Sequence, residues 1–149
     1  MLREYLAAMQ ALWSQDEASY EGEHISFGPS WAWPKPVQQP RVPVVLGAAG
    51  TERNFGWIAR SADGWLTTPG ESDLDAKITL LRKVWAEAGR DGAPQIRVLA
   101  GKPDPDVLAH WAQAGVTDVA FGLPDRAAEE VTAYLGRLAG KLGLAPAGA

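Results

Sequence analysis

The chain has 149 residues, of which 46% are hydrophobic and 21% charged, a composition typical of one soluble globular domain with a sizeable core. Its 14 Lys and Arg residues against 18 Asp and Glu residues argue against a nucleic-acid partner, which would select a basic surface. Cysteine is absent and only two histidines occur, so disulfides, thiolate zinc sites and a thiol nucleophile are excluded and we expect no metal. No apolar run approaches the roughly 18 residues of a membrane span, and a cytoplasmic protein without a membrane partner is expected.

Residues 1–42 are predicted to form a helix, a hairpin and a connector. Apolar side chains recur at helical spacing over residues 1–14, which predicts an amphipathic helix. Residues 18–28 alternate around Gly22 and predict a short β-hairpin. Five prolines within residues 29–43 predict an irregular but stiff connector, because proline fixes φ and has no backbone donor.

Residues 43–142 are predicted to form four strand–helix units, followed by a tail at 143–149. The predicted strands cover residues 44–46, 64–67, 96–100 and 118–121. The helices between them cover about 51–61, 73–88 and 104–114, and a last one reaches about residue 142. Asp104 and Asp125 are the expected N-caps of the last two helices, and Gly115 is expected to end the third.

Strand–helix units in series imply a parallel α/β sheet with right-handed crossovers. Four units are also half of an eight-stranded (β/α)₈ TIM barrel. A Rossmann-like open sheet is the competing architecture, although no G-x-G-x-x-G follows the first strand. We expect one domain, residues 1–149, with the fold class α/β and the form of a half barrel.

The first strand–helix turn is the best candidate for chemistry. Gly47, Ala48, Ala49 and Gly50 are small enough for backbone N–H groups to approach an anion, and Thr51 can cap the helix that follows. A helix N-terminus offers free donors and the positive end of a dipole, which together bind phosphate. The alternative is a tight turn that needs glycine only for its geometry.

Further candidates lie at or just after the ends of other strands. Thr67 and Thr68 could donate hydrogen bonds to a phosphate or a ring edge, or simply end a strand. Gly101, Lys102 and Gly122 share that face, where barrels and open α/β sheets bind ligands. Asp63, at the start of its strand, is expected to be structural.

No residue is assigned a catalytic role. His24 and His110 are expected to be exposed, and nothing near His24 in the sequence would orient it as a base. Trp31 and Trp33 could wall an aromatic pocket or bury against a partner chain, and packing is favoured. Neither a Ser-His-Asp set nor a nucleophile elbow is present in the sequence.

A series of short motifs, in order and at consistent spacing, resembles the second half of a luciferase-like monooxygenase. The motifs are the helix end Leu12-Trp13, the hairpin residues Tyr20-Glu21-Gly22 and Phe27, residues 33–38 (WPKPVQ), 43–47 (PVVLG), 62–65 (ADGW) and 114–118 (AGVTD). The branch that they resemble most is the actinobacterial one that uses the deazaflavin coenzyme F420.

The resemblance implies a (β/α)₈ barrel that binds a flavin or deazaflavin at the carboxyl ends of its strands and transfers hydride or activates oxygen. It also implies coenzyme F420 or FMN as the cofactor, with the turn Gly47–Thr51 in contact with its phosphate. Thr67 is added to the expected cofactor-binding residues because of its place at a strand end. Members of the family have about four further strand–helix units before the region that resembles residue 1. Those units hold most of the groups that contact the ring and transfer protons.

A half barrel would leave two parallel sheet edges and an apolar face open, so we expect the chain to associate. The partner is either a second copy, giving a homodimer, or a complementary N-terminal half-barrel chain, and the ligand is a small-molecule substrate. Two functions remain open. One is an oxidoreductase that is competent only as an assembled barrel; the alternative is a non-catalytic half barrel that acts as a ligand-binding or structural oligomer subunit.

Overall fold

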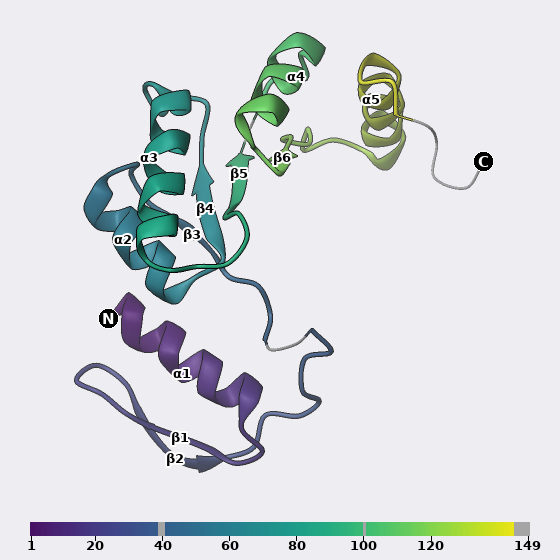
Figure 1. Cartoon of the computed structure of the whole chain (residues 1–149). Helices are drawn as coiled ribbons and strands as arrows, with labels where there is room; N and C mark the ends of the chain where they lie inside the picture. Colours follow the sequence, from purple (N-terminus) through teal and green to yellow (C-terminus); the bar gives the residue numbers. More distant parts are fainter. Residues whose placement is uncertain (39–40, 100, 145–149) are drawn as a thin grey trace. The chain divides into compact units, whose positions relative to one another are not determined.

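The computed structural model describes residues 1–38, 41–99 and 101–144. The chain forms two compact units, Met1–Pro43 and Val44–Ala149 (Figure 1).

The first unit is a helix packed on a hairpin. Helix α1 (Leu2–Ser14) precedes the antiparallel strands β1 (Ala18–Glu21) and β2 (Ser26–Ser30). Leu6, Ala8 and Ala18 are buried, at 3%, 2% and 1% exposure, and α1 contacts β1. The predicted helix and hairpin are confirmed, and the hairpin continues two residues beyond the predicted end.

The proline-rich connector is fastened to the end of α1. The Lys35 ammonium donates to the carbonyls of Leu12 and Gln15, where a helix leaves acceptors free. The same ammonium lies 5.0 Å from the centre of the Trp33 ring. Trp33 and Trp31 are 61% and 77% exposed, so neither ring is packed within the first unit.

The second unit is a parallel sheet with helices between its strands. The strands β3 (Val45–Gly47), β4 (Gly64–Thr67), β5 (Gln95–Leu99) and β6 (Asp118–Ala120) lie in the order β3-β4-β5-β6, all parallel. They alternate with α2 (Glu52–Ser61), α3 (Leu74–Glu87), α4 (Pro105–Ala114) and α5 (Ala128–Lys141). These four units confirm the predicted α/β half-barrel architecture. Ala100, the predicted last residue of the third strand, lies outside the described residues, as do residues 145–149 of the predicted tail.

The core of this unit lies between the sheet and the helices α2 and α3. It contains Phe55, Ile58, Trp65, Ile78, Leu81, Ile96 and Val98, each at most 1% exposed. Alternate strand residues point to the other face, where Arg97 and Leu99 are exposed. One face of the sheet is therefore covered by helices, and the residues of the other face remain accessible.

The ends of α4 are as predicted, whereas the start of α5 is not. Asp104 caps α4 by accepting hydrogen bonds from the N–H groups of Asp106 and Val107, and Gly115 ends it at φ 105°. The prediction that Asp125 caps α5 is wrong. That helix begins at Ala128 with Ala127 at the N-cap and no side-chain cap, so Asp125 lies two residues too early to reach the free N–H groups.

Hydropathy gives no sign of a membrane span. Among the helices of the described residues, none has both the length and the apolar character needed to cross a bilayer.

Candidate functional site at the carboxyl ends of the first strands

A pocket of 310 Å³ opens at the carboxyl ends of β3, β4 and β5. It is lined by Gly47, Ala48, Ala49, Leu66, Thr67, Thr68, Glu71 and Leu99. The carboxyl ends of parallel strands are the edge at which barrels and open α/β sheets bind ligands. Four of the six residues predicted to contact a cofactor, together with Thr68, therefore meet around one cavity. Gly50 and Thr51 are not among the lining residues.

The backbone of the turn is held by two side chains from outside it. The Trp65 indole N–H donates to the carbonyl of Ala48 at 2.7 Å, and the Asn54 amide donates to the carbonyl of Ala49 at 2.9 Å. Trp65 is itself fully buried, with its ring edge-on to Phe55 at 5.0 Å between centroids. The orientation of the turn is thus fixed by the core of the unit.

The first turn of α2 contains backbone N–H groups that are available as hydrogen-bond donors. Thr51 caps the helix, as predicted: its hydroxyl oxygen accepts a hydrogen bond from the N–H of Asn54 at 3.3 Å. Within the described part of the chain, the N–H groups of Glu52 and Arg53 have no acceptor. Such free donors at a helix N-terminus are suited to an anion.

The absence of a side chain at Gly50 lets Lys77, a residue of α3, approach this turn closely. A Cβ atom at position 50 would lie 2.9 Å from Cδ of Lys77 and 3.2 Å from a carboxylate oxygen of Glu71, and Gly50 is buried beneath them. The side chains of Lys77 and Glu71 therefore cover the turn on the side of α3. The small residue at 50 permits this close approach.

The other candidate residues lie elsewhere. Gly101 is buried, and a Cβ there would lie 2.6 Å from a methyl group of Val119, so this glycine serves packing. Lys102 and Gly122 are exposed and do not line the pocket. The Asp63 carboxylate accepts a hydrogen bond from the N–H of Val44 at 2.7 Å, which is the structural role expected for it.

Both histidines are exposed, as expected, but each has acidic neighbours. His110 Nε2 lies 2.8 Å from a carboxylate oxygen of Asp75, which joins α4 to α3. The sequence offers no group to orient His24 as a base, and in the structure the ligand atoms of Glu4 and Glu23 lie within 4.8 Å of its ring nitrogen. Glu4 comes from a different element, 20 residues away in the sequence, so the hairpin pattern gave no sign of it.

Sequence reasoning missed Trp65, Asn54 and Lys77 as supports of the turn. A signal was available for Trp65 alone, since a buried tryptophan needs an acceptor for its N–H group. The contacts of Lys77 depend on how α3 crosses the sheet, which no local pattern specifies.

Comparison with known proteins places these features in a family. The family model described as luciferase-like monooxygenase matches residues 1–134. Uncharacterized proteins of Mycobacterium tuberculosis and Mycobacterium bovis are 65% identical over 142 residues, which is 95% of this chain and 50% of each relative. The chain therefore spans about half the length of these curated relatives.

More distant relatives have named cofactors. An F420-dependent glucose-6-phosphate dehydrogenase from Kineococcus radiotolerans is 29% identical over 92 residues, 60% of this chain and 26% of its own length. An FMNH(2)-dependent dimethylsulfone monooxygenase from Pseudomonas putida is 30% identical over 69 residues, 46% of this chain and 18% of its own length. The crystal structure of monooxygenase RslO1 from Streptomyces bottropensis superposes with a TM-score of 0.57 at 19% identity, covering 93% of this chain and 43% of that one. This last likeness concerns the fold.

Proposed function

Because the chain belongs to the luciferase-like monooxygenase family, we propose that it is the carboxyl-terminal half barrel of an oxidoreductase that binds coenzyme F420 or FMN. The observation that carries the proposal is the pair of free N–H donors at the start of α2, which follows a turn whose small residues Gly47, Ala48 and Ala49 line the pocket. The barrel is competent only when assembled, since this chain spans half the length of its relatives. The distant relatives support a cofactor of this type by their names.

The residues around the turn fit a phosphate group. Gly47, Ala48 and Ala49 offer no side chain large enough to block an approach to the backbone. The N–H groups of Glu52 and Arg53 would donate to the phosphate oxygens, as helix N-termini commonly do.

Two further side chains would complete this contact. Thr67 lines the same pocket, and its hydroxyl makes a long hydrogen bond of 3.5 Å to the carbonyl of Thr68, which a ligand acceptor would replace. Lys77 would contribute a positive charge on the side of α3, and the Glu71 carboxylate would oppose it. Glu52, in the first turn of α2, adds a second carboxylate, so the N–H donors and Lys77 must outweigh two negative charges.

A bound flavin or deazaflavin would supply the hydride chemistry. The part of this chain is to hold and orient the group that carries the phosphate. Trp65 and Asn54 keep the carbonyls of the turn engaged, so that these acceptors do not face an incoming anion.

The experiment is a fluorescence titration of the chain with coenzyme F420 and, separately, with FMN. We expect saturable binding of one of them. Thr67→Val, which removes a donor, should weaken binding about tenfold or more, the effect of losing one hydrogen bond to a charged group. Gly50→Leu, whose side chain would displace Lys77 from the turn, should weaken binding as well. Gly136→Leu is the matched control, because Gly136 lies in α5 with open space around it.

The outcome that would contradict the proposal is the absence of binding to both cofactors, or binding that neither variant weakens while circular dichroism shows an intact fold. That result would favour the alternative of a non-catalytic half barrel that serves as a ligand-binding or structural subunit. A difference between the two titrations identifies the cofactor.

A further inference from the structure

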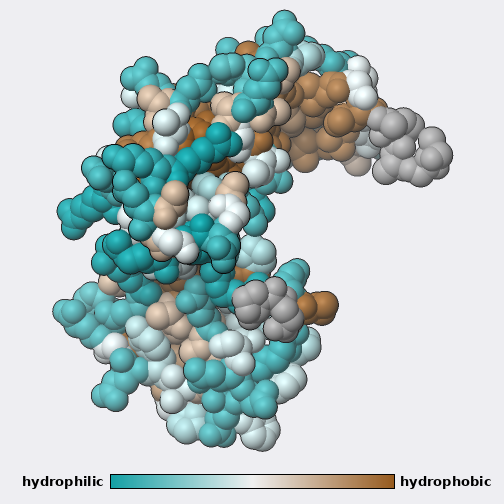
Figure 2. Space-filling view, viewed as in Figure 1, coloured by the Kyte–Doolittle hydropathy of each residue, from teal (hydrophilic) through white to brown (hydrophobic). Residues whose placement is uncertain are grey.

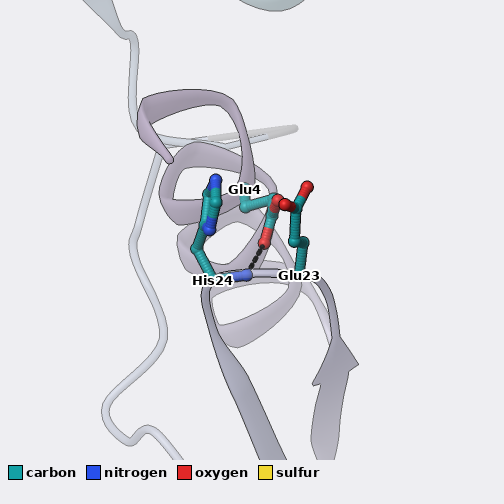
Figure 3. A group of neighbouring side chains, drawn as sticks. All are labelled: Glu4, Glu23 and His24. Atoms are coloured by element: carbon teal, nitrogen blue, oxygen red, sulfur yellow. Dashed lines mark hydrogen bonds between the residues drawn. The ribbon is translucent and has the colours of Figure 1, made fainter.

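Three metal-ligating side chains converge in the first unit, outside the cofactor pocket (Figure 3). Glu4 comes from the first turn of α1, and Glu23 and His24 come from the tip between β1 and β2. One ligand atom from each lies within 4.8 Å of the others. We propose that these three side chains form a site for a divalent transition-metal ion of the Zn²⁺ type.

The carboxylate of Glu4 is held at this place by its surroundings. The backbone N–H of His24 donates to Glu4 Oε2 at 2.7 Å (Figure 3). Gly22 leaves the space that this carboxylate occupies: a Cβ at position 22 would lie 2.9 Å from Cδ of Glu4 and closer still to its Oε2. Any other residue at 22 would move Glu4, so the glycine and the carboxylate fit each other.

The charges at the site suit a cation. The cluster brings two carboxylates and one imidazole together, with one ligand atom of each within 4.8 Å of the others. A divalent ion would neutralise both carboxylates while the imidazole supplied a neutral ligand.

The kind of ligand selects the kind of metal. Imidazole nitrogen is a ligand typical of zinc and its neighbours, whereas magnesium and calcium prefer oxygen alone. Three protein ligands and one water form a common four-coordinate arrangement of zinc. His24 and Glu23 are exposed, which leaves room for that water.

The ligand atoms must move closer to hold the ion. Bond lengths of about 2.0–2.1 Å in a tetrahedron place ligand atoms about 3.3 Å apart, against separations of up to 4.8 Å here. Glu23 and His24 can close this difference by side-chain rotation, because both side chains are solvent-exposed at a hairpin tip. Binding would then add a link between the hairpin tip and α1, beside the hydrogen bond from His24 to Glu4, and would stabilise this unit by linkage.

Isothermal titration of the untagged chain with zinc chloride tests the proposal. We expect one ion per chain. Glu4→Gln keeps an oxygen that accepts from His24 but removes the charge, and His24→Asn removes the imidazole; each should weaken affinity at least tenfold, as even outer-shell changes around a metal often do. Gly22→Ala retains all three ligands but displaces Glu4, so it should weaken affinity as well.

Matched controls separate this cluster from the other acidic and histidine side chains. Glu21→Gln alters a carboxylate of the same hairpin outside the cluster, and His110→Asn removes the histidine that pairs with Asp75. Both controls should retain wild-type affinity. The proposal is overturned if no ion binds stoichiometrically, if Glu4→Gln and His24→Asn leave the affinity unchanged, or if binding is lost in His110→Asn instead. Circular dichroism of every variant shows that the loss is not one of folding.

Discussion

At the scale of single residues, Arg90 joins the last turn of α2 to the start of the sheet. Its guanidinium donates to the carbonyls of Ala59 and Ala62 at 2.7 and 3.0 Å, where the helix leaves acceptors free. It also lies 3.5 Å from the carboxylate of Asp63, which accepts from the N–H of Val44. The Arg90 side chain thus donates to free carbonyls at the end of α2 and also pairs with Asp63, the residue that accepts from the N–H group just before β3.

Replacing Arg90 by Ala should therefore destabilise the chain by about 2–3 kcal/mol, since hydrogen bonds from a charged donor to buried acceptors are lost. The measurement is the free energy of unfolding in urea. Lys83→Ala is the control, because Lys83 forms only an exposed pair with Glu87 at 3.8 Å, and it should change stability by less than about 0.5 kcal/mol. Equal losses in the two variants would contradict this role.

The carboxyl of Glu4 gives a prediction about pH. The N–H of His24 lowers its pKa below the ordinary value of 4.5 in the folded chain. The stability that Glu4 contributes is therefore present above about pH 4.5 and is lost as the pH falls through the lowered pKa. In metal-free buffer, Glu4→Gln should flatten the fall of the urea midpoint with decreasing pH in that range. An unchanged slope would contradict the assignment.

At the scale of elements, the N-caps show what a sequence can specify. Thr51 and Asp104 were predictable because each stands directly before a single helical start, and Asp104 is followed by proline at the first helical position. Asp125 met the same residue rule, but several helix-forming residues follow it and permit a later start. Local preference predicted that a helix would form there, and could not determine its first residue.

The two aspartates can be compared directly. Asp104→Ala should cost about 1 kcal/mol, because the N–H groups of Asp106 and Val107 lose their acceptor. Asp125→Ala should change stability by less than about 0.5 kcal/mol, since Asp125 caps nothing in α5. Urea unfolding of the two variants measures both values. If Asp125→Ala lowers stability as much as Asp104→Ala does, Asp125 caps α5 after all and the assignment of Ala127 as its N-cap is wrong.

The candidate site likewise has residues that the sequence could predict and residues that it could not. The small residues of the turn and Thr67 could be predicted, because a strand end followed by a helix start is a local pattern. The supports of the turn could not: the Trp65 indole reaches Ala48 across 17 residues, and Lys77 meets Gly50 only because α3 packs beside α2. Such contacts depend on how helices cross the sheet, which periodicity within one element does not encode.

At the scale of the whole molecule, the last two helices, α4 and α5, are poorly buried. Neither α4 nor α5 has a buried residue in the structure, although both carry apolar side chains. Figure 2 shows apolar side chains gathered over α5. Leu123, Leu135 and Leu99 are 58%, 45% and 40% exposed in this unit. The strands β3 and β6 each have a neighbour on one side only within the described sheet, so both edges offer free backbone groups.

These surfaces lead us to expect that the chain associates with a second copy when no complementary half is present. Full burial of an exposed leucine contributes about 1.5–3 kcal/mol, and these leucines are about half exposed, so each contributes about half of that value. Association at micromolar concentration therefore also needs the open sheet edges and the other apolar side chains of α4 and α5 in the contact. Sedimentation should show a mass above the 15.9 kDa of one chain. Leu135→Glu should shift the mass toward the monomer, whereas Val37→Glu, at a 92% exposed position of the first unit, should not. A wild-type chain that stays monomeric at micromolar concentration with a cooperative unfolding transition would contradict this expectation, because its apolar helices would then be stable in water without a partner.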